Sequence, residues 1–234
     1  MAKSKKKDNI TVIVVSVWVL ALSVGAVLYI MYIADIMPGI VNVVLLNVLF
    51  WYLLLIPTIY FMRRDKEKLM DIGFTNKKLP KQILLGVILA IGTVSVFGLG
   101  MSLLFDVFRF NWNELPNVNI GLFAITFLMQ FITIALVEEI IFRGHMFKKL
   151  QDNRNSNCPA IAVSSIVFGA LHIPSFVFLG NELLTVSGWY FVLIATLIGV
   201  AYGICRAKGA TMITLIFAHA LHNATMGTLS HIFY

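Results

Sequence analysis

Four of the ionisable residues inside or at the end of long uncharged segments of the chain stand out: Glu138, Glu139, His172 and His219. A charged group in hydrocarbon costs about 2.5–3.5 kcal/mol on insertion scales, so such residues are rare in membrane helices and mark candidate functional sites. A carboxylate and an imidazole can together take a proton from water, and a second imidazole can donate to a developing oxyanion. These residue types therefore suit the hydrolysis of an amide by an activated water molecule.

The spacing around the two carboxylates gives them different expected roles. Glu139 and Arg143 are four residues apart, so on a helix they share a face and are predicted to form an ion pair. Glu138 is rotated by about 100° from Glu139 and faces a different neighbour. We expect Glu139 to stay charged and support the helix, while Glu138 exchanges protons with water.

A second pair with helical spacing lies near the end of the chain. His219 and Asn223 are four residues apart and place a ring and an amide on one helix face, which suits the binding of an oxyanion. His222 borders this face or packs elsewhere, and both readings stay open. Phe168 shares a face with His172 and is expected to belong to the core.

The elements that carry these residues are predicted to be membrane-spanning helices, each of which needs about 20 apolar residues. The chain offers seven such segments, and the fourth to seventh contain all of the candidate residues. The sequence therefore predicts an all-α, polytopic membrane helix bundle with its active site in spans 4 to 7. The predicted spans are Ile10–Ile33, Gly39–Met62, Ile83–Phe105, Ile120–Val137, Pro159–Leu179, Trp189–Cys205 and Ala210–Phe233.

The composition agrees with a membrane protein. Of the 234 residues 59% are hydrophobic and 12% are charged, whereas a soluble domain carries about 25% charged residues. This excludes a disordered chain and a disulfide-stapled secreted scaffold. Cys158 and Cys205 fall at cytoplasmic span ends, where thiols stay reduced, so no disulfide is expected.

The net charge of +7 is explained by topology. With seven spans, every Lys and Arg except Arg109 falls in loops on one side, which the positive-inside rule assigns to the cytoplasm. We therefore expect a multi-pass protein of the cell membrane with a cytoplasmic N-terminus, and no nucleic-acid partner. The first apolar run exceeds the length of a signal-peptide core, about 7–15 residues, and is read as a retained anchor.

The depths of the candidate residues agree with one another. At 1.5 Å per residue from the cytoplasmic ends of their spans, Glu138, His172 and His219 lie about 15, 20 and 16 Å deep. These depths are near the middle of a ~30 Å hydrocarbon core. The sequence therefore predicts that separate helices bring these side chains together.

Three motifs in this order resemble the CAAX protease and bacteriocin-processing family of intramembrane endopeptidases, also called the Abi family. The family pattern EExxxR occurs as EEIIFR at 138–143, FxxxH as FGALH at 168–172, and HxxxN as HALHN at 219–223. The resemblance covers about residues 128–223. It indicates one integral-membrane domain over 1–234, with N-terminal spans in 1–119 and catalytic spans in 120–234.

The resemblance implies a helical bundle whose active site opens to the cytosol and the membrane. It implies that Glu138 and His172 activate water and that His219 and Asn223 hold the oxyanion. Glu139 and Arg143 would be supporting residues. No cofactor is expected. The alternative is a zinc ion held by Glu138, His172 and His219. The chain has no H-E-x-x-H pair, which argues against this alternative.

The expected function is that of an intramembrane endopeptidase acting within the lipid bilayer near its cytoplasmic face. A peptide pheromone, a bacteriocin or a membrane protein is favoured as substrate over a prenylated peptide, because the chain resembles the compact bacterial branch of the family. The alternative is a non-catalytic bacteriocin-immunity protein or a scaffold for a cell-envelope enzyme. An inactive scaffold would be expected to have lost a motif residue, and all six are present.

Gly199 and Gly203 form a GxxxG pattern within the sixth predicted span. In membrane helices such a pattern permits close approach of a neighbouring helix. We expect internal packing rather than a dimer face, so the sequence leaves the oligomeric state open.

Overall fold

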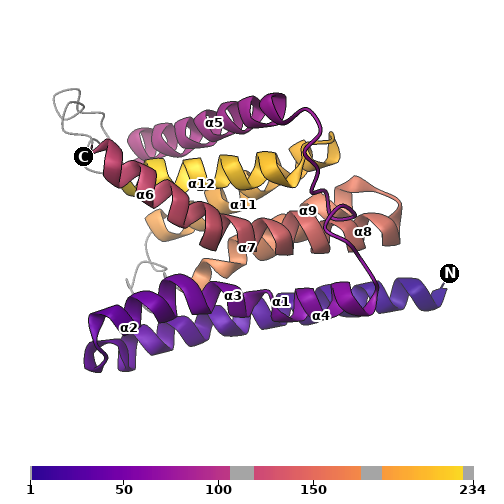
Figure 1. Ribbon diagram of the computed structural model, residues 1–234, viewed down its shortest axis with the longest axis horizontal. Helices are drawn as coiled ribbons and strands as arrows, with labels where there is room; N and C mark the ends of the chain where they lie inside the picture. Colours follow the sequence, from indigo (N-terminus) through magenta and orange to yellow (C-terminus); the bar gives the residue numbers. More distant parts are fainter. Residues whose placement is uncertain (1, 106–118, 175–185, 229–234) are drawn as a thin grey trace. The chain divides into compact units, whose positions relative to one another are not determined.

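A computed structural model describes residues 2–105, 119–174 and 186–228, which are mostly helical and contain no β-strand (Figure 1). Within these ranges, four helices are long and apolar enough to cross a membrane. The predicted all-α membrane fold is thus confirmed, while the count of seven spans stays a prediction. The four helices are Lys7–Tyr32, Leu79–Gly100, Ile120–Arg154 and Gly188–Ala207.

The other three predicted spans are helical but shorter or interrupted. The second consists of consecutive segments that break at Leu55, just before Pro57, whose missing N–H is tolerated in the first turn of a new helix. Residues 106–118, which include Arg109, and the predicted span ends at 175–179 and 229–233 lie outside the described residues. The segments concerned are α2 (Gly39–Val44), η2 (Leu45–Leu49), α3 (Phe50–Leu54), α4 (Ile56–Arg64), α9 (Asn157–Leu171) and α12 (Met212–Thr228).

The chain forms two compact units. Unit 1 comprises residues 1–74 and 137–209, and unit 2 comprises residues 75–136 and 210–234. The first and second motifs belong to unit 1, whereas the third motif belongs to unit 2. The prediction of a single domain with a division at residue 119 stays a prediction.

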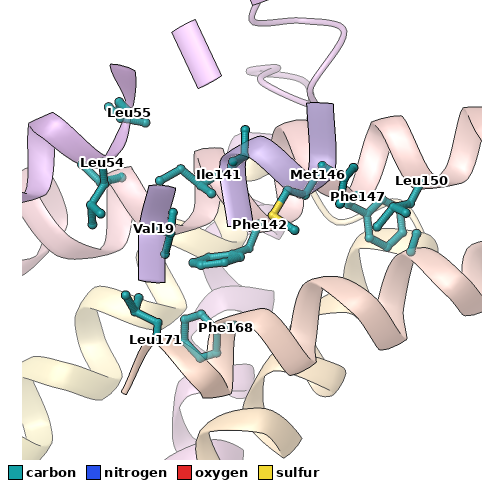
Figure 2. Close-up of a cluster of buried hydrophobic side chains, with 14 of the residues drawn as sticks. Val19, Leu54, Leu55, Ile141, Phe142, Met146, Phe147, Leu150, Phe168 and Leu171 are labelled. Atoms are coloured by element: carbon teal, nitrogen blue, oxygen red, sulfur yellow. The ribbon is translucent and has the colours of Figure 1, made fainter. Parts of the chain in front are cut away.

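Unit 1 is built around α1 (Ala2–Tyr32), with α3 and α4 running beside it (Figure 1). Its core also takes side chains from α8 (Phe147–Arg154), α9 and α11 (Val186–Ala207). Figure 2 shows how large apolar side chains of this core interleave. Among them are Val19, Leu54, Leu55, Ile141, Phe142, Met146, Phe147, Leu150, Phe168 and Leu171.

Close approach between α9 and α11 depends on glycine. A Cβ atom added to Gly169 of α9 would overlap the side chain of Thr196 on α11. A Cβ atom on Gly199 would lie 3.1 Å from the Cβ of Ser165, and one on Gly203 would also crowd α9. The GxxxG pattern therefore serves packing inside unit 1, as predicted from the sequence.

An ion-pair cluster holds the loop after α4 against α8. Lys149 contacts Asp65 at 2.7 Å and Glu67 at 2.9 Å, and His145 donates through Nδ1–H to Glu67 at 3.2 Å. Hydrogen bonds from Arg64 and Lys149 hold the pKa of the Asp65 carboxyl well below its usual range. Burial opposes the charge of Glu67, but its bonds to His145 and Lys149 outweigh burial and lower its pKa to about 2.

Unit 2 consists of α5 (Leu79–Phe105), α6 (Ile120–Gln130), η4 (Phe131–Ala135) and α12 lying side by side (Figure 1). Gln82 of α5 accepts a hydrogen bond from Thr214 of α12 at 2.5 Å. The rings of Phe127 on α6 and Phe217 on α12 meet edge to face, with their centroids 5.3 Å apart. These contacts fix α12 between two neighbouring helices.

Candidate functional site

The first motif lies on a helix that contains two wide turns. The continuous helix Ile120–Arg154, here called the motif helix, runs past the predicted span end at Val137. Two π-helical segments, η4 and η5 (Ile140–Met146), flank the short α7 (Leu136–Glu139) that carries both carboxylates. A π turn closes its hydrogen bonds over five residues and is frequent at functional sites.

The predicted ion pair of the first motif is confirmed. Arg143 Nη1 donates to Glu139 Oε1 at 3.1 Å, and both side chains are completely buried. Glu138 is also buried, with 1% of its surface exposed. A buried pair of this kind keeps each charge compensated, whereas loss of either partner leaves a charge in a medium of low dielectric.

Aromatic rings surround the guanidinium of Arg143. Its Cζ atom lies 4.3 Å from the ring centre of Phe168, 5.5 Å from that of Tyr202 and 5.8 Å from that of Phe142. Ring faces within about 6 Å attract a cation. The sequence did not single out Tyr202, because nothing in an apolar segment marks which ring will face a charge on another helix.

Phe168 joins the first motif to the second. Its ring packs edge to face against Phe142, with centroids 5.3 Å apart, and against His172 at 5.2 Å. Figure 2 shows Phe142 and Phe168 facing each other across the core. With 3% of its surface exposed, Phe168 is a core residue, as predicted.

The backbone of Phe168 also sets the protonation of His172. His172 Nδ1 lies 3.0 Å from the carbonyl oxygen of Phe168, and a carbonyl can only accept, so Nδ1 carries the proton. In the neutral ring the lone pair then belongs to Nε2. His172 is half-buried and caps the C-terminal end of α9.

A second arginine supports the backbone of the first motif. Arg206 Nε, at the end of α11, donates to the carbonyl oxygen of Arg143 at 3.3 Å. Gly73 takes a positive φ of 102°, and a Cβ atom there would overlap the Arg206 guanidinium. From the sequence, Arg206 was expected only to be a cytoplasmic charge, because its bond to the motif depends on tertiary structure.

The third motif lies on α12 in unit 2. His219 is buried, Asn223 is half-buried, and both are on one continuous helix, as their spacing predicted. The open question about His222 is answered by α5: His222 Nδ1 lies 3.0 Å from the hydroxyl oxygen of Thr93. Since Thr93 donates its own proton to the carbonyl of Ala90, the His222 ring is the donor in this contact.

Asn223 has a partner that sequence analysis missed. Its Nδ2 donates to Oε1 of Gln130, the last residue of α6, at 3.1 Å. The sequence does mark Gln130 as unusual, because it is the only amide side chain in the uncharged run 120–137.

The structure thus groups the candidate residues by unit. Glu138, Glu139 and Arg143 lie in unit 1 together with His172, whereas His219 and Asn223 lie in unit 2. The meeting of all of them at one site stays a prediction. In neither unit do the described residues include three His, Cys, Asp or Glu side chains grouped to hold a metal ion.

The fold and these buried polar groups define a multi-pass helical membrane protein with ionisable residues inside its helices. The family model described as type II CAAX prenyl endopeptidase Rce1-like matches residues 120–225, a segment that contains all three motifs. Over this segment the chain is similar to the CAAX-type endopeptidases that the model describes. Neither the curated proteins nor the solved structures gave a match.

Proposed function

We propose that the protein hydrolyses a peptide bond with a water molecule activated by Glu138 and His172. The water oxygen bonds to the carbonyl carbon while its proton passes to the carboxylate or to Nε2 of the imidazole. His219 and the Asn223 amide donate to the resulting oxyanion. When the tetrahedral intermediate collapses, the C–N bond breaks and the held proton goes to the leaving amine.

The observation that carries this proposal is the double contact of Phe168. Its ring lies against Arg143, whose pair with Glu139 supports the helix turn that bears Glu138, and its carbonyl fixes the proton of His172 on Nδ1. Both proposed water-activating groups, Glu138 and His172, are therefore supported by one residue. A general base must present the correct nitrogen in a fixed orientation, and this arrangement provides it.

The proposed substrate is an unprenylated peptide pheromone, a bacteriocin or a membrane protein, cleaved near the cytoplasmic face of the cell membrane with the N-terminus in the cytoplasm. The proposed chemistry uses no metal. The zinc alternative would recruit Glu138, His172 and His219 as ligands and supply a metal-bound water. Cleavage that survives exhaustive chelation would rule that alternative out.

The test uses the full chain in lipid vesicles and two internally quenched peptides. One is an apolar peptide without lipid, and the other ends in a farnesylated CAAX sequence. We expect cleavage of the first peptide, and we expect Glu138→Gln to lower its turnover at least about 100-fold because the carboxamide cannot accept the proton. Tyr202→Phe, which keeps the ring beside Arg143, is the matched control and is expected to retain turnover.

Full turnover by Glu138→Gln would contradict the role of this carboxylate. Preference for the farnesylated peptide would overturn the substrate proposal but leave the hydrolytic one. Failure of the wild-type protein to cleave either peptide would favour the non-catalytic immunity or scaffold function.

A further inference from the structure

We propose that Gln130 is a positioning residue that fixes the orientation of the Asn223 carboxamide for oxyanion binding. This inference rests on the proposed function. The juxtaposition that carries it lies wholly within unit 2: Asn223 Nδ2 donates to Gln130 Oε1 at 3.1 Å. No motif of the family resemblance includes Gln130.

The need for such a residue follows from the chemistry of the amide. A carboxamide has two N–H donors on one side and a carbonyl acceptor on the other, and rotation about its terminal torsion is only weakly restricted. If the Asn223 amide turned over, its oxygen would face the oxyanion and repel it. A bond from one N–H to an acceptor selects the orientation in which the other N–H remains a donor.

Gln130 meets the requirements for that acceptor. In the structure its Oε1 accepts from Asn223 Nδ2, so Asn223 presents its amide nitrogen and not its oxygen to Gln130. Gln130 ends α6, and the Phe127–Phe217 contact fixes α6 against α12, one helix turn before Gln130. The position of the acceptor is therefore set by the packing of two helices.

A second glutamine in unit 2 provides a matched control. Gln82 accepts hydrogen bonds from Thr211 and Thr214 near the start of α12 and contacts neither His219 nor Asn223 in any described bond. Both glutamines thus attach α12 to a neighbouring helix, but only Gln130 bonds to a residue of the third motif. Replacement by methionine keeps the length of either side chain and removes its acceptor.

The experiment measures kcat and KM with the apolar quenched peptide in lipid vesicles. We expect Gln130→Met to lower kcat about tenfold, because the Asn223 amide loses the hydrogen bond that selects its orientation, and to leave KM unchanged. Gln82→Met is expected to lower the unfolding temperature while the folded protein retains its kcat. Asn223→Ala is expected to lower kcat about 100-fold or more.

The decisive measurement is the double variant. If Gln130 acts through Asn223, Gln130→Met adds no further loss of kcat in the Asn223→Ala background. A full additional tenfold loss in that background, or unchanged kcat in Gln130→Met alone, overturns this assignment while the proposed function stands. Absence of cleavage by the wild-type protein overturns the proposed function and this inference with it.

Discussion

Arg143 is among the largest side chains that the described structure buries completely, and its environment combines one carboxylate with three aromatic rings. Such a residue is expected to be a structural support for Glu138 and His172 rather than a group that reacts. It links the helix that carries Glu138 to α9, whose C-terminal cap is His172. A substitution of Arg143 is therefore expected to lower the stability of the fold first, and to lower activity as a result.

Arg143→Ala is expected to lower the free energy of unfolding by about 3–5 kcal/mol, because Glu139 would become an uncompensated buried charge. Thermal unfolding in detergent and the yield of folded protein measure this effect. The double variant Glu139→Gln with Arg143→Met removes both charges and should recover part of the lost stability. A fully stable but inactive Arg143→Ala protein would show that the pair acts in the chemistry.

At the scale of helices, unit 1 depends on close contact between α9 and α11. Gly169→Ala is expected to destabilise the fold by about 1–3 kcal/mol, because the new Cβ atom must displace Thr196. Gly25→Ala in α1 is the matched control, since its Cβ atom would meet nothing within 4 Å. That control should leave the unfolding temperature unchanged or raise it, because alanine favours a helix over glycine. Equal destabilisation by both variants would contradict the role assigned to close packing.

The ion-pair cluster at the loop after α4 predicts a pH dependence of stability. The pKa of Glu67 is lowered from 4.5 to about 2, so its charged form stabilises the fold fully above pH 4.5. This contribution is lost as the pH falls from 4.5 towards 2. Solvent in the adjoining pocket of about 520 Å³ screens the pairs, so we expect only about 1 kcal/mol.

Glu67→Gln should therefore reduce stability at pH 7 and remove the part of the acid transition that Glu67 causes. Unfolding curves measured from about pH 7 down to about pH 2, which include that transition, would measure both effects. Asp152→Asn is the control, because Asp152 pairs with Lys148 at an exposed position, where ion pairs contribute little. An acid transition identical in wild type and Glu67→Gln would show that Glu67 does not contribute.

At the scale of the whole molecule, the orientation in the membrane is a prediction from charge that labelling can test. Cys158 is exposed at the start of α9 and is expected on the cytoplasmic side. In a Cys205→Ser background, a membrane-impermeant maleimide should label Cys158 in inside-out vesicles and fail to label it in intact cells. Labelling in intact cells would reverse the proposed orientation.

The sequence by itself determined the features that depend on distance along one helix. The apolar runs identified a helical membrane protein, and the four-residue spacing of Glu139 and Arg143 correctly predicted their ion pair. The same holds for the internal role of Gly199 and Gly203. These predictions succeed because helix geometry fixes which residues share a face, whatever packs against it.

Only the tertiary structure decided which groups meet across helices. The ring of Tyr202 beside Arg143, the bond of Gln130 to Asn223 and the bond of His222 to Thr93 depend on the rotation and register of neighbouring helices. The π turns on either side of α7 add to this, because they shift the faces of the motif helix away from regular α periodicity. A pattern with a period of 3.6 residues carries no information about such shifts, so the partners had to come from the fold.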